Sequence, residues 1–287
     1  MFPIKEGELI KILPKEGPSV AEVKKYLDKY NDEFIVIKCG GSVLIDPNLF
    51  NIFIQDIAVL NKLGFNPVIV HGGGKRINNK LSELNIKSSF IKGLRVTDKD
   101  IINIVEDILI DFNKEIVQAL NNLNCKARRI NIKENNIISV KQENKDLGFV
   151  GTPTRINKDI LNEVIQSNEV PVIAPLGLDE NNQTFNINAD TVAGAIAKEL
   201  NARRLMIISD VEGVLDNKKK LIPEINSDKA KELIAKEIIS GGMIPKINNC
   251  LDVASNGVKG VVIIDGRKNH SILFELLSDK GSGTLIR

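Results

Sequence analysis

The chain has 287 residues, of which 43% are hydrophobic, and its 39 basic and 37 acidic residues leave a net charge of only +2. This length and composition support one large α/β domain or two coupled lobes around a buried core, and they exclude a largely disordered chain. The interspersed charges form neither a nucleic-acid footprint nor a polybasic membrane patch. We therefore expect a small-molecule partner, no nucleic acid and no membrane.

The rare residue types narrow the chemistry further. Cys39, Cys125 and Cys250 are widely spaced, which argues against a disulfide framework and against a zinc site. The N-terminal residues lack the order of a signal peptide, and no apolar run approaches the roughly 20 residues of a membrane span. A cytoplasmic protein is expected. Because the histidines are only His71 and His270, lysines and carboxylates must carry any catalysis.

The first predicted element is a helix over residues 19–30. Ser19 and Glu22 have the spacing of a helix capping box, in which each side chain accepts a hydrogen bond from the other's backbone. This helix either covers a sheet edge and packs on the core, or it serves oligomerisation or regulation.

Beyond this helix, short and continuously apolar runs recur, which is typical of parallel strands buried on both faces. The runs span residues 34–38, 67–71, 170–176, 204–210 and 260–265. Segments with helical periodicity lie between them, at residues 49–63, 98–120, 189–200 and 228–239. The alternation predicts βαβ units in an open, doubly wound sheet. The polar stretch at 130–154 predicts a small hairpin region, and a lobe boundary is expected near 177–185.

The strand at 34–38 ends in Lys38, followed by Gly40 and Gly41. In open α/β sheets, ligands bind outside the carboxyl ends of the strands. A lysine there can meet a phosphate as a point charge, and glycine N–H groups can approach the oxygens without obstruction by Cβ. The alternative is a tight strand-to-helix turn with a lysine that reaches solvent.

The second strand ends in His71, three glycines (72–74) and Lys75, and it leads into a helix. The glycines form a backbone nest, and the helix N-terminus adds positive potential for an anion. Neither G-x-x-x-x-G-K-[ST] nor G-x-G-x-x-G occurs, so the two commonest nucleotide motifs are absent. Taken alone, the triple glycine could be only a turn. Taken alone, His71 is more typical of a structural histidine than of a catalytic one.

Four later segments also place polar residues beside predicted strand or helix ends. Arg95 can bind a carboxylate with two parallel hydrogen bonds, or it can form a surface salt bridge. Asp190 lies in the first turn of a helix that Asn188 can cap, either to compensate the helix dipole or to anchor two cations. Asp210 follows a strand, and Lys246 follows two glycines at a helix start. Both of these allow an ordinary loop-and-cap interpretation.

Together these motifs resemble the amino acid kinase family. The resemblance runs from residue 34 to residue 287 and rests on seven motifs in order: IKCGGS, VIVHGGG, GLRVT, NINAD, SDVEGV, GGMIPK and GSGTL. It implies a three-layer α/β/α sandwich around a mainly parallel open sheet. It also implies an N-terminal extension with a helix (1–33), an acyl-amino-acid-binding lobe (34–178) and a nucleotide-binding lobe (179–287).

Within the family, the chain is similar to members that use ATP with Mg²⁺ to phosphorylate the γ-carboxylate of N-acetyl-L-glutamate in arginine biosynthesis. By this similarity, Lys38 and Lys246 stabilise the transition state and Asp190 organises both lysines. The remaining implied site residues are Gly73, Gly74, Arg95 and Asn186 for the acceptor, with Gly41 and Asp210 for the phosphoryl group and nucleotide. Magnesium is expected on the ATP phosphates, so no dedicated metal ligands are implied.

The resemblance leaves several alternatives open. The helix at 19–30 is similar to that of arginine-responsive members and of kinase domains fused to an acetyltransferase, which suggests arginine as an effector. The family forms dimers, tetramers and hexamers, so a homo-oligomer is expected. One rival activity is phosphorylation of an aminoadipate derivative. Another is an inactive kinase-like domain that senses arginine.

Overall fold

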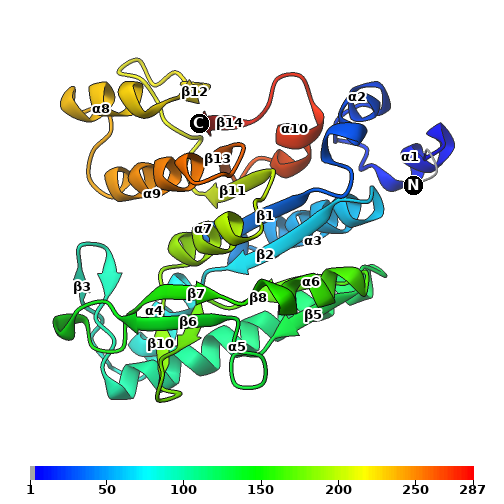
Figure 1. The fold of residues 1–287 in the computed structure, drawn as a ribbon. Coiled ribbons are helices and arrows are strands. Elements are labelled where there is room, and N and C mark those ends of the chain that lie inside the picture. Colours follow the sequence, from blue (N-terminus) through cyan, green and yellow to red (C-terminus); the bar gives the residue numbers. More distant parts are fainter. Residues whose placement is uncertain (1–3) are drawn as a thin grey trace.

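The computed structural model describes residues 4–287, and its centre is an eight-stranded sheet (Figure 1). The strand order is β12-β14-β13-β11-β1-β2-β8-β5. Within the described residues, every neighbouring pair in this sheet is parallel except β13 and β14. The bounds are β1 (Phe34–Cys39), β2 (Asn66–His71), β5 (Ala127–Ile130), β8 (Val170–Ile173), β11 (Arg204–Ser209), β12 (Glu224–Ile225), β13 (Val261–Asp265) and β14 (Gly283–Ile286). The mainly parallel open sheet is confirmed.

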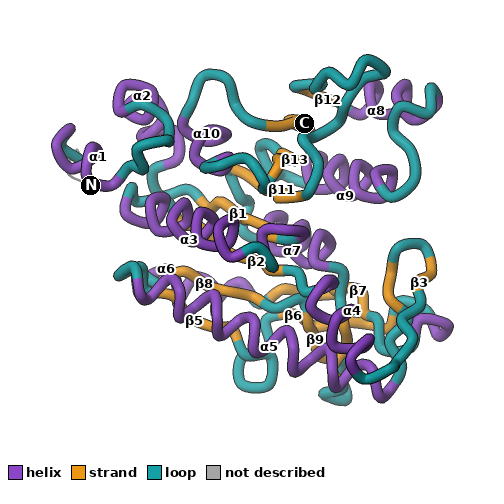
Figure 2. Tube along the Cα trace, turned by 180° about the vertical axis from the view of Figure 1, so that it is seen from behind, coloured by secondary structure: helices purple, strands orange, loops and turns teal. Residues whose placement is uncertain are grey.

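Helices cover both faces of this sheet. Their bounds are α1 (Glu6–Ile12), α2 (Val20–Tyr30), α3 (Pro47–Lys62), α4 (Gly74–Glu83), α5 (Lys99–Asn122), α6 (Lys158–Gln166), α7 (Ala189–Glu199), α8 (Ser227–Ala235), α9 (Met243–Ser255) and α10 (Ser271–Leu277). Figure 1 shows α6 and α7 in front of the sheet, and Figure 2, from behind, shows α3 and α5 in front. The predicted three-layer sandwich is therefore present.

The sequence of β1 explains why both faces need a cover. Side chains alternate across a strand, so Val36 belongs to the core under α7 and α9, whereas Ile35 and Ile37 belong to the core under α3 and α10. All three side chains are fully buried. Burial on both faces is what a run of β-branched residues without polar alternation predicts.

A smaller, four-stranded sheet lies beside the carboxyl end of the main one and has the order β10-β9-β6-β7. It contains β6 (Ile138–Gln142), β7 (Gly151–Ile156), β9 (Leu176–Leu178) and β10 (Thr184–Asn186), and a separate hairpin joins β3 (Phe90–Ile91) to β4 (Leu94–Arg95). The antiparallel pair β6–β7 confirms the predicted hairpin region.

The single strand expected at 170–176 is wrong. The run divides into β8 in the main sheet and β9 in the smaller one, with Pro175 between them. Pro175 has no backbone N–H to donate to a ladder, and the chain passes from the main sheet to the smaller one at this residue. The lobe boundary at 178/179 falls in the turn between β9 and β10, and the division into lobes stays a prediction.

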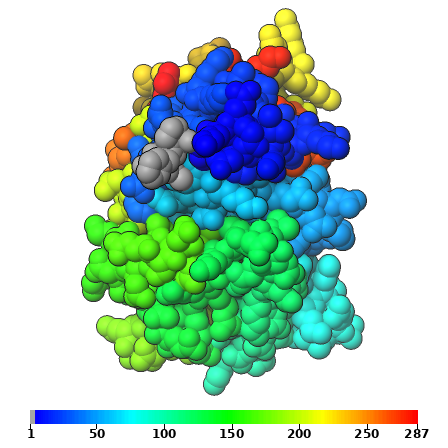
Figure 3. Space-filling view, turned by 90° about the vertical axis from the view of Figure 1, so that its right-hand side faces the viewer, coloured from blue at the N-terminus to red at the C-terminus, as the bar shows by residue number. Residues whose placement is uncertain are grey.

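The capping box at the start of α2 is confirmed. Ser19 Oγ accepts the N–H of Glu22 at 3.3 Å, and the Glu22 carboxylate accepts the N–H of Ser19 at 3.1 Å. Val23 and Tyr30 are buried, and α2 packs beside α10. Figure 3 shows this N-terminal segment in blue over the upper half of the molecule, where it covers the core beside α3. Among residues 4–287, no helix combines the length and apolarity needed to span a membrane.

Candidate active site

The carboxyl ends of β1 and β2 open into a cavity of about 380 Å³. Seven of the nine residues predicted for the site line it: Lys38, Gly41, Gly73, Gly74, Arg95, Asn186 and Asp190. Lys246 lines a second cavity of about 890 Å³, and Asp190 belongs to both. Asp210 lines neither of these two cavities. The site thus consists of two adjoining spaces with one aspartate at their junction.

Asp190 contacts both predicted lysines. Its Oδ1 lies 2.9 Å from Lys38 Nζ as an ion pair, and its Oδ2 accepts a hydrogen bond from Lys246 Nζ. Lys38 comes from the end of β1, Lys246 from the first turns of α9, and Asp190 from the first turn of α7. All three side chains are less than one-fifth exposed. Three segments far apart in sequence therefore form one largely buried charge cluster.

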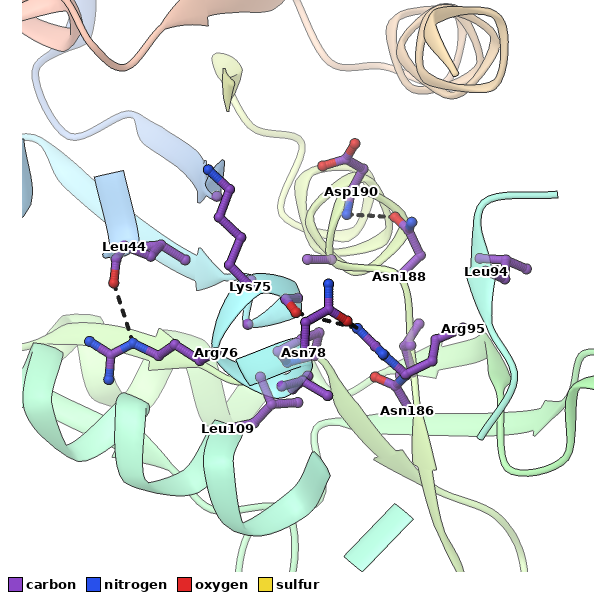
Figure 4. Close-up of a pocket in the computed structure, with 18 of the residues that line it drawn as sticks. Leu44, Lys75, Arg76, Asn78, Leu94, Arg95, Leu109, Asn186, Asn188 and Asp190 are labelled. Carbon is purple, nitrogen blue, oxygen red and sulfur yellow. Dashed lines mark hydrogen bonds between the residues drawn. The ribbon is translucent and has the colours of Figure 1, made fainter. Parts of the chain in front are cut away.

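The start of α7 fixes the position of this aspartate. Asn188 caps the helix, and its Oδ1 accepts the N–H groups of Asp190 and Thr191 at 2.9 and 3.2 Å (Figure 4). The Asn249 side chain donates to the Asp190 carbonyl at 3.1 Å and so ties α9 to the same turn. The cap predicted for Asn188 is confirmed, and it orients the carboxylate toward both lysines.

Electrostatics keep Asp190 ionised. Burial raises the pKa of its carboxyl, but attraction by Lys38 and Lys246 outweighs burial and lowers the pKa to about 2. One negative charge therefore faces two positive charges, and the cluster carries a net charge of +1. A buried site with excess positive charge is suited to bind an anion.

The two glycines after Lys38 provide space for charged groups. A Cβ at Gly40 would lie 2.5 Å from Lys38 Nζ, so a larger residue would displace the ammonium. At Gly41 the backbone has a φ of +66°, and a Cβ there would collide with the Asp210 carboxylate. Because that carboxylate accepts the N–H of Ser42 at 2.7 Å, Asp210 holds the turn closed around these glycines.

The glycines after β2 serve two different purposes. A Cβ at Gly73 would collide with the Leu109 side chain of α5, so packing explains that glycine. A Cβ at Gly74 would meet nothing within 4 Å, because Gly74 faces the open space of the cavity that it lines. Gly74 begins α4, where backbone N–H groups have no partner within the helix. This helix start presents N–H donors to the cavity.

His71, at the end of β2, is structural. It is buried, and it lies 3.0 Å from the Gly72 carbonyl and 3.1 Å from the Asn113 side chain. Burial lowers its pKa to about 4, so the imidazole is neutral near pH 7. The structural interpretation of His71 is confirmed.

Arg95 is held at the far wall of the first cavity. Its guanidinium donates to Asn78 Oδ1 at 2.7 Å, to the Gly74 carbonyl at 3.3 Å and to Ser88 Oγ, and the Phe90 ring lies 4.8 Å away (Figure 4). The side chain is only 7% exposed. Its positive charge has no acidic partner among these contacts, which leaves it available to a ligand carboxylate.

Asn186, on β10, lines the same cavity, and its amide lies 3.5 Å from Thr97 Oγ1. Among the described residues, no group of three or more His, Cys, Asp or Glu side chains is placed to bind a metal ion. The sequence motifs indicate neither Asn78, which orients Arg95, nor a role for Lys75. Asn78 belongs to none of the motifs, and Lys75 follows the triple glycine without any pattern that indicates its partner. Both side chains act through residues distant in sequence, Arg95 for Asn78 and Asp210 for Lys75.

With this geometry in place, comparisons with known proteins define the class. The model of the "Amino acid kinase family" matches residues 33–265, and the chain belongs to this family. It is 79% identical over its full length to an acetylglutamate kinase of Pelagibacter ubique (strain HTCC1062), and the match also covers all of that protein.

Two solved structures share the fold. A protein of Streptococcus mutans UA159, smu.665, matches with a TM-score of 0.73 and 32% identity, over 88% of this chain and 98% of that one. N-acetylglutamate synthase from Neisseria gonorrhoeae, complexed with coenzyme A and N-acetyl-glutamate, matches with a TM-score of 0.84 and 21% identity. That match covers 93% of this chain and 62% of the synthase, so it shows likeness of fold.

Proposed function

We propose that this chain is an ATP-dependent kinase that phosphorylates the γ-carboxylate of N-acetyl-L-glutamate to N-acetylglutamyl phosphate, a step of arginine biosynthesis. The observation that carries the proposal is the buried Asp190 carboxylate, which holds Lys38 and Lys246 between two adjoining cavities. The 79% identity to an acetylglutamate kinase supports the choice of acceptor. The two cavities offer separate space for acceptor and nucleotide.

The reaction needs charge neutralisation more than proton transfer. The acceptor carboxylate is already ionised at neutral pH, so no general base is required. One of its oxygens attacks the γ-phosphorus of Mg-ATP, the bond to the β,γ-bridging oxygen breaks, and ADP leaves with the electron pair. Lys38 and Lys246 stabilise the negative charge on the moving group and its flanking oxygens. Magnesium enters with the nucleotide, held largely by its phosphates.

The backbone and the first cavity supply the remaining contacts. The N–H groups of Gly41 and Gly74 donate to the transferred phosphoryl oxygens, and Gly73 borders the acceptor. Arg95 binds the α-carboxylate with its buried guanidinium, while Asn186 binds the acetylglutamate. On this assignment, residues 34–178 hold the acceptor and residues 179–287 hold the nucleotide, with Asp210 in the nucleotide loop.

An acceptor survey tests this assignment. ADP release is measured with ATP and, in turn, N-acetylglutamate, glutamate, aspartate and acetylaminoadipate. We expect the highest kcat/KM with N-acetylglutamate, because the distance from Arg95 to the lysine pair must match one side-chain length. Faster turnover of the longer aminoadipate derivative would favour the rival kinase activity. If no ADP is released with any of the four acceptors, the result would favour the inactive, arginine-sensing domain.

We also propose arginine as an inhibitor, because α2 is tied to the terminal segment after α10. Asp279 accepts a hydrogen bond from Tyr26 at 2.9 Å and pairs with Lys25 at 2.8 Å. Nearby, Glu275 is largely buried, and burial raises the pKa of its carboxyl, which accepts the N–H of Ser282 at 2.7 Å. A carboxylate in this position can pair with a guanidinium.

Millimolar arginine is expected to lower the rate of ADP release. Asp279→Asn, which removes the negative charge that pairs with Lys25, is expected to raise the arginine concentration needed for half-inhibition. Its activity without arginine should stay unchanged, because Asp279 lies outside both cavities. If arginine is titrated into the full chain and the rate of ADP release does not change, the proposal is refuted. A cytoplasmic location and a homo-oligomeric state stay predictions.

A further inference from the structure

Lys75 is a cation in a place where a helix disfavours one. It is the second residue of α4, and the first turn of this helix contains no acidic residue. The helix dipole makes an N-terminal turn unfavourable for positive charge. A lysine at this position is therefore expected to depend on a negative partner, either a side chain or a ligand.

In the structure that partner is Asp210, 135 residues further along the chain. Lys75 Nζ lies 3.1 Å from Asp210 Oδ2 and 3.1 Å from Ser42 Oγ. The opposite oxygen of Asp210 accepts the N–H of Ser42 at 2.7 Å. Lys75 thereby links α4 to the turn after β1 and to the turn after β11, which come from opposite sides of the proposed division into lobes.

Lys75 lies beside both glycines, Gly41 and Gly74, whose N–H groups are proposed to donate hydrogen bonds to the phosphoryl oxygens. Its backbone directly follows Gly74, and its ammonium contacts Ser42, which directly follows Gly41. The side chain lines the 380 Å³ cavity and extends from α4 to the left of Asp190 in the view of Figure 4. Lys75 and Asp210 are 45% and 36% exposed, so the pair is accessible to an incoming anion and can exchange partners.

We propose that Lys75 is a third cation of the phosphoryl-transfer site: it pairs with Asp210 in the free enzyme and exchanges that carboxylate for an oxygen of the terminal phosphate when ATP binds. The exchange replaces one carboxylate charge with the larger charge of the triphosphate, so it favours the nucleotide. The inference rests on the function proposed above, because it places the terminal phosphate between Gly41 and Gly74.

Lys75→Gln tests the proposal, since glutamine keeps the length and polarity of the side chain but removes its charge. Isothermal titration calorimetry without acceptor measures the Kd of Mg-ATP and of Mg-ADP. We expect the Kd of Mg-ATP to rise about tenfold, the usual size of one charge-assisted hydrogen bond, and that of Mg-ADP to rise less. Lys75→Arg should restore most of the loss, and the KM for acetylglutamate at saturating ATP should stay unchanged.

Lys80→Gln is the matched control, because Lys80 lies on the same helix and pairs with an exposed glutamate, Glu83, outside both cavities. Its nucleotide affinities should equal those of the unaltered protein. Unchanged or tighter Mg-ATP binding by Lys75→Gln, or equal losses for ATP and ADP, would overturn the proposal. Because calorimetry needs no turnover, such a result is distinguishable from a failure of the catalytic roles of Lys38 and Lys246.

Discussion

Replacing either Lys38 or Lys246 by alanine is expected to lower kcat by a factor on the order of 10² to 10³, the usual cost of removing one preorganised donor to a transition state. Each ammonium is largely withdrawn from water, and a charge in such an environment acts strongly on the moving phosphoryl group. The rate of ADP release at saturating ATP and acetylglutamate measures the effect.

The helices α7 and α9, which carry Asp190 and Lys246, also provide a control ion pair. Lys198 on α7 and Asp252 on α9 form an exposed ion pair at 2.7 Å, outside both cavities. Lys198→Ala therefore removes a lysine between α7 and α9 without touching the site, and kcat should not change. Circular dichroism and thermal unfolding establish that each variant is folded. A folded Lys38→Ala or Lys246→Ala variant with unaltered kcat would contradict the transition-state roles.

The parts of the fold that the sequence predicts are those set by local patterns. The buried strands β1, β2, β11 and β13 contain apolar runs rich in β-branched residues, and the helix α2 has a capping box. These signals lie within a few residues of one another, so they survive without tertiary information. The glycine turns after β1 and β2 are predicted for the same reason, and the parallel order of the strands brings them together.

The parts that the sequence does not predict depend on contacts between distant segments. The helix α10 has only seven residues and begins after His270, whose left-handed φ of 54° no periodic pattern indicates. The strands β3 and β4 have two residues each, too short for any alternation. Likewise, the motifs supplied Asp190 and the two lysines, but only the fold shows which oxygen faces which ammonium.

Asp190→Asn is expected to lower kcat strongly and to alter stability in acid. Asparagine preserves the shape but leaves Lys38 and Lys246 without a counter-charge in a buried site, where they repel each other. Their positions around the phosphoryl group should then change, so kcat should fall by about tenfold or more through lost positioning. Asp252→Asn, the exposed counterpart between the same helices, should leave kcat unchanged.

The pH dependence separates the charge of Asp190 from its shape. Its folded pKa, about 2, lies below the ordinary value of 3.8, so the folded protein binds this proton less readily than the unfolded chain. The stabilisation is complete above about pH 5 and is lost as the pH falls through about 2, and a shift of this size corresponds to about 2 kcal/mol. The difference in unfolding free energy between the unaltered protein and Asp190→Asn should therefore shrink by about that amount from pH 5 to pH 2. A constant difference across that interval would mean that the carboxylate charge does not hold the two lysines together.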